Sequence, residues 1–136
     1  MSGRVTLLLL SFTILANGQS IELDRTADLL NGRAWEKLGT QRVAYLLGVV
    51  EGIRAAQMIA AVNDANASEA ISDALLSKNF TVNDTAKELD TLYSDRANIL
   101  IPIIIMVTHV TRIFKGTFSK GELERQLIEL RKTVNK

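Results

Sequence analysis

The sequence contains no cysteine, one proline and one histidine among its 136 residues, and only 5% of its residues are aromatic. The absence of cysteine excludes a disulfide framework and the thiolate ligands of most structural zinc sites. A single histidine cannot complete such a site, and the acidic spacing of a calcium-binding loop is also absent. The sequence therefore predicts no metal and no cofactor, and a fold that apolar packing alone must stabilise.

The first 18 residues combine a basic residue, Arg4, with an apolar run over residues 5–16 and a small residue at Gly18. This pattern is typical of a cleaved secretory signal peptide. The run of about 12 residues is shorter than the roughly 20 that a membrane-spanning helix needs. We therefore expect a periplasmic or secreted protein that contacts the membrane only through this segment before cleavage, with a single domain over residues 19–136.

Arg4 is the only charged residue in the expected signal peptide, so 15 of the 16 basic side chains remain and balance the 15 acidic ones. A neutral domain lacks the excess of positive charge that attracts nucleic acid. The sequence also lacks a G-x-S-x-G elbow, a phosphate-binding glycine loop and an H-E-x-x-H motif. These absences favour a protein without enzymatic activity and without a nucleic-acid partner.

Apolar residues recur at helical spacing throughout the remaining chain, which predicts an all-α fold. We expect a compact bundle of four main helices plus short helices. The longest helix is predicted to begin after Thr40 and to run to about Val62, and its few polar side chains predict that it is covered on most sides. Asn31-Gly32 is interpreted as a stop after a short segment at residues 25–30, and residues 64–68 as a loop.

Two capping-box patterns, Thr81 with Asp84 and Ser119 with Glu122, predict the starts of two further helices. Between these helices, residues 99–116 form the most apolar run, which ends at a glycine stop signal. The two capped helices should turn apolar stripes inward: Val82, Ala86, Leu89 and Tyr93 in the first, and Leu123, Leu127, Leu130 and Val134 in the second.

The long helix carries glycines at Gly48 and Gly52, and each costs roughly 1 kcal/mol relative to alanine inside a helix. The favoured explanation is close crossing of a second helix, with Tyr45 filling space beside the contact. A shallow groove that admits a ligand or a partner's side chain is the alternative. Under the first explanation, Gly52→Leu should destabilise the domain by about 1–3 kcal/mol through overpacking.

Polar and aromatic residues at two places are the candidates for a binding surface. On the long helix, Glu51 and Arg54 are three residues apart and can form an ion pair. The lone His109 lies one turn from two isoleucines and is expected to be a hydrogen-bonded packing residue. Asp95 and Asn98 also fit turn and capping roles. The candidate binding residues are Tyr45, Glu51, Arg54, Tyr93, Asp95 and Asn98.

Trp35 and the segment at residues 44–52, AYLLGVVEG, resemble the signature helix of the Tai-type family, the type VI secretion amidase immunity proteins. The segment at residues 89–98, LDTLYSDRAN, is similar to a group of small secreted bacterial proteins of unknown function. The first resemblance implies a helical periplasmic protein that blocks a cell-wall amidase toxin. Proteins of that family commonly carry cysteines, which this chain lacks.

These observations leave three hypotheses about function. The first is an exported helical binding protein with a periplasmic protein partner, such as an immunity-like inhibitor of a cell-wall hydrolase. The second is a module that binds a small molecule or lipid in an apolar cavity between helices. The third is an enzyme centred on Glu51 and His109.

Overall fold

The computed structural model describes residues 23–72 and 80–135, so the expected signal peptide lies outside the described residues. The described chain is mostly helical, which confirms the all-α prediction. Its elements are β1 (Arg25–Thr26), β2 (Leu29–Leu30), α2 (Gly32–Leu38), the 3-10 turn η1 (Gly39–Gln41), α3 (Arg42–Asn63), α4 (Ala65–Ser72), α5 (Val82–Ser94), the 3-10 turn η2 (Arg96–Asn98), α6 (Ile103–Lys115) and α7 (Lys120–Val134).

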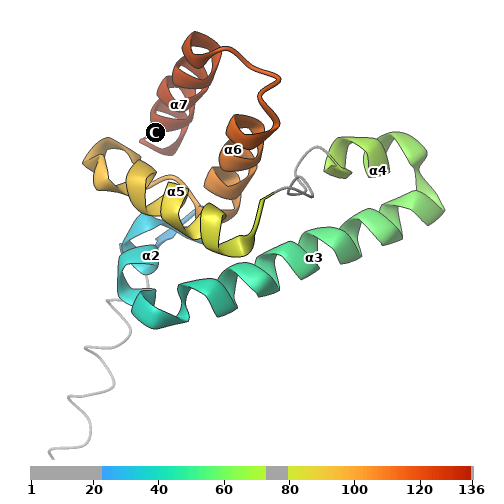
Figure 1. Cartoon of the computed structure of the whole chain (residues 1–136), viewed down its shortest axis with the longest axis horizontal. Helices are drawn as coiled ribbons and strands as arrows, with labels where there is room; N and C mark the ends of the chain where they lie inside the picture. The colour runs from blue at the N-terminus through green and yellow to red at the C-terminus, as the bar shows by residue number, and fades with distance from the viewer. Residues whose placement is uncertain (1–22, 73–79, 136) are drawn as a thin grey trace, which may run out of the picture.

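Helices α2, α5 and α6 form the body of the molecule, and α7 lies against α6 (Figure 1). The long α3 runs along one side of this body and extends past it, and α4 folds back along that extension. The core is therefore concentrated at one end of α3. Its fully buried large side chains are Trp35, Leu46, Leu89, Ile101, Ile103, Met106, Val107 and Val110.

The interpretation of Asn31-Gly32 as a helix stop was wrong, because Asn31 begins a helix instead. Its side chain accepts a hydrogen bond from the Arg33 N–H at 3.0 Å and caps α2. The preceding residues form a two-stranded antiparallel hairpin, with positive φ angles at Ala27 and Asp28 in its turn. Asparagine favours both helix starts and helix stops, so the local sequence did not decide between them.

Two boundaries around α3 also differ from the prediction. Thr40 lies within η1, and α3 begins at Arg42 after Gln41, which makes no side-chain cap. Asp64 was assigned to a loop, but its carboxylate accepts hydrogen bonds from the N–H groups of Asn66 and Ala67, and α4 begins at once. Because Asp64 is a good N-cap, only this one residue separates the end of α3 from the start of α4.

Both predicted capping boxes are confirmed. The side chains of Thr81 and Ser119 accept hydrogen bonds from the N–H groups of Asp84 and Glu122, whose carboxylates accept in return from the capping residues. These hydrogen bonds lower the pKa of Asp84 and of Glu122. The stripe of α5 is inward as predicted, and Gly116 ends α6 in the left-handed conformation.

A cluster around Trp35 connects α2, α3 and α5. The buried indole Nε1 donates a hydrogen bond to Asp90 Oδ1 at 2.8 Å. Arg42 donates to the same oxygen at 2.8 Å and to the Trp35 carbonyl oxygen at 3.0 Å, and its guanidinium lies 5.2 Å from the Trp35 ring centroid. One carboxylate thus fixes the angle at which α3 leaves the body.

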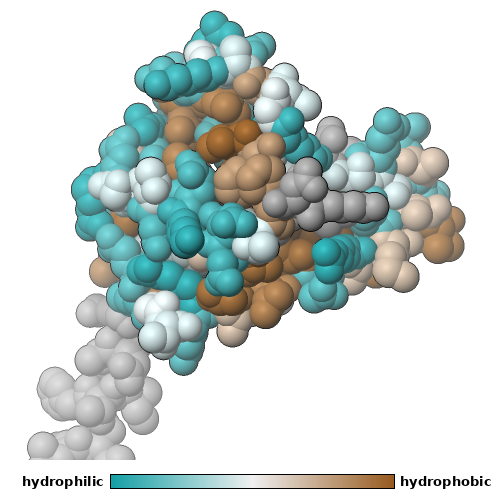
Figure 2. All heavy atoms as spheres, viewed as in Figure 1, coloured by the Kyte–Doolittle hydropathy of each residue, from teal (hydrophilic) through white to brown (hydrophobic). Residues whose placement is uncertain are grey.

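The prediction that the long helix is covered on most sides was wrong. Only Leu46, Val50 and Ile53 of α3 are buried. Large apolar side chains stay exposed along it, and Figure 2 shows hydrophobic residues following α3 along the lower edge of the molecule. Gly48 and Gly52 face open space, since a Cβ atom added at either would meet nothing within 4 Å. In the described residues no second helix crosses there, so overpacking by Gly52→Leu is no longer expected within one chain.

Two glycine-to-alanine substitutions should have opposite effects on stability. A Cβ atom at Gly32 would lie 2.5 Å from the Tyr93 ring and 2.9 Å from the Ile99 carbonyl oxygen. We expect Gly32→Ala to lower the free energy of unfolding by about 1–3 kcal/mol through overpacking. Gly52→Ala should raise it by up to about 1 kcal/mol, because alanine favours the helix and nothing obstructs it. Urea denaturation of both variants measures the free energy of unfolding. Equal destabilisation by both substitutions would contradict the open position of Gly52.

Candidate functional site

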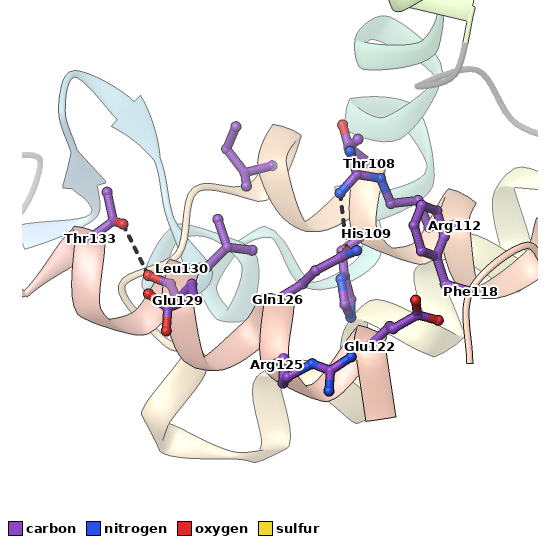
Figure 3. A pocket seen from close by; sticks show the side chains of 11 residues that line it. Thr108, His109, Arg112, Phe118, Glu122, Arg125, Gln126, Glu129, Leu130 and Thr133 are labelled. Carbon is purple, nitrogen blue, oxygen red and sulfur yellow. Dashed lines mark hydrogen bonds between the residues drawn. The ribbon is translucent and has the colours of Figure 1, made fainter. Parts of the chain in front are cut away.

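A pocket of about 590 Å³ lies between α6 and α7 (Figure 3). This volume is within the range of roughly 300–1,000 Å³ that small-molecule sites occupy. Helix α6 contributes one wall, α7 the other, and the α6–α7 connection closes one end. The lining residues are Ile105, Thr108, His109, Arg112, Phe118, Glu122, Arg125, Gln126, Glu129, Leu130 and Thr133.

The pocket exists because α7 packs only loosely on the body. None of its residues is buried, although the predicted apolar stripe does turn inward and Leu127, Leu130 and Val134 pack against the core. Polar contacts hold the helix at two points along its length. Arg131 donates to Asn98 Oδ1 at 2.9 Å and to Asp95 at 2.6 Å, and Arg112 donates to Gln126 at 3.1 Å. A helix with few buried side chains needs little free energy to move, so α7 can act as an adjustable wall.

His109 lies at the base of this pocket and differs from its prediction. The residue is 3% exposed, and its buried Nδ1 atom has no hydrogen-bond partner among residues 23–72 and 80–135. Burial and the nearby Arg112 guanidinium lower the pKa of His109, so the imidazole is neutral at pH 7. An unpaired buried nitrogen costs about 1–3 kcal/mol of stability.

The charges around the pocket balance. Arg112 and Arg125 contribute two positive charges, and Glu122 and Glu129 two negative ones. Glu122 forms hydrogen bonds in the N-terminal cap of α7. The Arg112 guanidinium lies 5.6 Å from the Phe118 ring centroid. The chemistry on offer is an apolar surface with one neutral hydrogen-bonding nitrogen, rather than a strong field of one sign.

Three of the predicted binding residues have structural roles near η2. Tyr93 is 2% exposed and donates its hydroxyl to the Ile101 carbonyl oxygen at 2.9 Å, and burial raises its pKa far above the ordinary value. Asn98 is equally buried and donates to the Leu92 carbonyl oxygen at 2.7 Å. Asp95 caps η2 and accepts from Arg131. These contacts match the turn and capping roles that Asp95 and Asn98 were also expected to have.

The other three predicted residues belong to α3. Tyr45 is half-buried and packs against the core, and its burial raises its pKa. Glu51 and Arg54 form the expected ion pair at 2.8 Å with both side chains exposed. None of the six predicted residues lines the pocket, and Glu51 and His109 do not share a site. Their assignment to binding stays a prediction.

Sequence reasoning missed the pocket residues of α6 and α7 except for His109. A signal was present in their spacing: Ile105, His109 and Arg112 follow one face of α6 at intervals of four and three residues. Glu122, Gln126 and Glu129 follow one face of α7 in the same way. Each stripe alone describes an ordinary solvated helix face, and only the structure shows that the two face each other.

Among residues 23–72 and 80–135, no group of three or more histidine or acidic side chains is placed to hold a metal ion. No family model, no curated protein and no solved structure matches the chain.

Stability should depend on His109 in a definite pH window. Its pKa is lowered in the folded state, so the unfolded chain binds the proton first as the pH falls below the ordinary value of 6.5. The free energy of unfolding should therefore fall between pH about 6.5 and about 5, a range in which no other side chain ordinarily titrates. His109→Gln should abolish this slope, as measured by urea denaturation at several pH values. An unchanged slope in the variant would contradict the burial of a neutral imidazole.

Proposed function

We propose that this protein is an exported, non-enzymatic binding protein that holds a small molecule between α6 and α7. The observation that supports this function best is a pocket of about 590 Å³ with a largely apolar lining that includes the buried, neutral His109. Ligand sites usually combine apolar walls with a few placed polar groups, and this pocket has that composition. Residues 1–18 would act as the cleaved signal peptide, and the helices would pack as a bundle around the α5–α6 core.

The lining indicates the chemistry of the ligand. Ile105, Leu130 and Phe118 offer apolar and aromatic surface, which favours a ligand with an apolar body. The lining also offers a few polar groups, among them Thr108, Gln126 and Thr133, for hydrogen bonds to the ligand. Because the lining arginines and glutamates balance, the ligand should be uncharged overall or should carry its charge at the solvent-exposed mouth.

An immunity-like inhibitor of a cell-wall hydrolase is the second candidate. One observation favours it: the segment that carries the resemblance lies on α3, where Leu47, Gly48 and Glu51 are exposed. An inhibitor of this kind would use the α3 surface and leave the α6–α7 pocket unused. A hydrolase captured from periplasmic extract, lost on substitution of Leu47 and retained when the pocket is filled, would support this candidate.

Filling the pocket should remove small-molecule binding without unfolding the protein. Ile105 is 37% exposed and lines the pocket, so a tryptophan there can enter the cavity without displacing the core. We expect Ile105→Trp to weaken binding of anilinonaphthalene sulfonate, a dye with an aromatic body and one sulfonate group, at least about tenfold, the equivalent of about 1.4 kcal/mol. Fluorescence titration measures the affinity, and native mass spectrometry detects any molecule that co-purifies with the wild type.

Ile128→Trp is the matched control. Ile128 is 41% exposed on α7 and does not line the pocket, so the same chemical change should leave dye affinity unaltered. The exposed face of α3 is identical in both variants, which removes its contribution from the comparison. Equal dye affinity in the wild type and in both variants would contradict the pocket as the binding site.

A further inference from the structure

The outward side of α3 is apolar and uncovered. Leu47, Met58, Ile59 and Val62 are 49%, 73%, 65% and 85% exposed. The opposite side of the helix carries the three buried residues and contacts α4 and α5, so both neighbours lie on the inward side (Figure 1). An exposed apolar stripe of this length on a folded domain marks an interaction surface.

The charges within this stripe are arranged symmetrically. Leu47, Glu51, Arg54 and Met58 follow one another at intervals of four, three and four residues. From the N-terminus the order is apolar, acidic, basic, apolar. From the C-terminus the acidic and basic residues exchange places. When two copies of this helix pack in antiparallel orientation, Glu51 of each copy lies opposite Arg54 of the other. Leu47 of each copy likewise lies opposite Met58 of the other. Such self-complementarity is what an isologous two-fold contact requires.

The two glycines of α3 lie beside this stripe and not within it. At about 100° per residue, Gly48 and Gly52 are roughly 90° and 130° around the helix from the line of Leu47, Glu51, Arg54 and Met58. The contact therefore depends on the charge order and the apolar residues of the stripe, and the glycines take no part in it.

We propose that α3 binds α3 of a second copy of this chain in an antiparallel, two-fold symmetric contact centred between Glu51 and Arg54. A lipid bilayer is the other apolar environment to consider, since this stretch is long and apolar enough to span one by length and composition alone. Two charged side chains halfway along the helix make a lipid environment costly. Leu46 also packs into the core, and Val50 and Ile53 are buried on the same side of α3.

Charge reversal with restoration tests the contact. Glu51→Arg and Arg54→Glu each place like charges opposite one another in the dimer and should weaken it at least about tenfold. The double variant restores the symmetric order and should recover the wild-type dissociation constant. Both side chains are exposed, so all three variants should keep the wild-type circular dichroism spectrum. Sedimentation velocity over a range of concentrations of the complete chain gives the constants.

Single cysteines report the direction of the helices, because the wild-type chain has none. Glu51→Cys lies on the contact line, about 4.5 Å along the axis from its own copy, and should form a disulfide-linked dimer, for which the two Cα atoms must come within about 7 Å. Val62→Cys places the two thiols roughly 25–30 Å apart in an antiparallel pair and should not cross-link. Cross-linking at both positions would indicate parallel association.

Three results would overturn the proposal. The first is a wild-type chain that remains monomeric at about 100 µM, a concentration at which even a weak dimer is populated. The second is a double charge variant as weak as either single variant. The third is binding of monomers to vesicles of phosphatidylethanolamine and phosphatidylglycerol in a flotation assay, unaffected by any charge reversal, which would assign this face to a lipid surface.

Discussion

The hydrogen bond from the buried Trp35 indole to Asp90 is the contact on which the arrangement of the other helices depends. The same Asp90 oxygen accepts from Arg42 at the start of α3. A carboxylate that two donors share is held in one orientation, and it aligns α2, α3 and α5 at a single point. Because α3 is fixed at its first turn and is 22 residues long, most of it must lie beyond the core. Its exposed apolar surface is thus a consequence of the geometry at its start.

The core takes four of its eight fully buried large apolar side chains from α6, and α7 adds none that is buried. Each buried apolar side chain contributes roughly 1.5–3 kcal/mol, so stability is concentrated in the body of the molecule. The outer helices are held by partly buried residues and exposed ion pairs, which contribute little. Mobility should therefore be greatest in α7 and in the far half of α3, the two places where apolar surface remains open.

The sequence predicted correctly those parts of the fold that depend on interactions between residues close together in the chain. The capping boxes at Thr81 and Ser119, the inward stripe of α5 and the stop at Gly116 follow from short-range hydrogen bonding and helical period. The coverage of α3 could not be predicted in the same way, because hydrophobicity indicates that a surface will be buried but not which molecule buries it. For His109 the expected packing role was correct, since the residue is buried, but its Nδ1 atom lacks the expected hydrogen bond among the described residues, because the partners of a side chain depend on the tertiary packing around it.

The pocket and the α3 surface stabilise different parts of the molecule and need not depend on each other. A ligand between α6 and α7 binds only the folded arrangement of α7 and raises its stability by mass action. A second copy on α3 does the same for the far half of that helix. The two surfaces share no residue, and they are linked through α5, which contacts both α3 and α6, and through the hydrogen bond from Lys115 of α6 to the Ser72 carbonyl oxygen of α4. Any effect of binding at one surface on the other would have to be transmitted through these contacts.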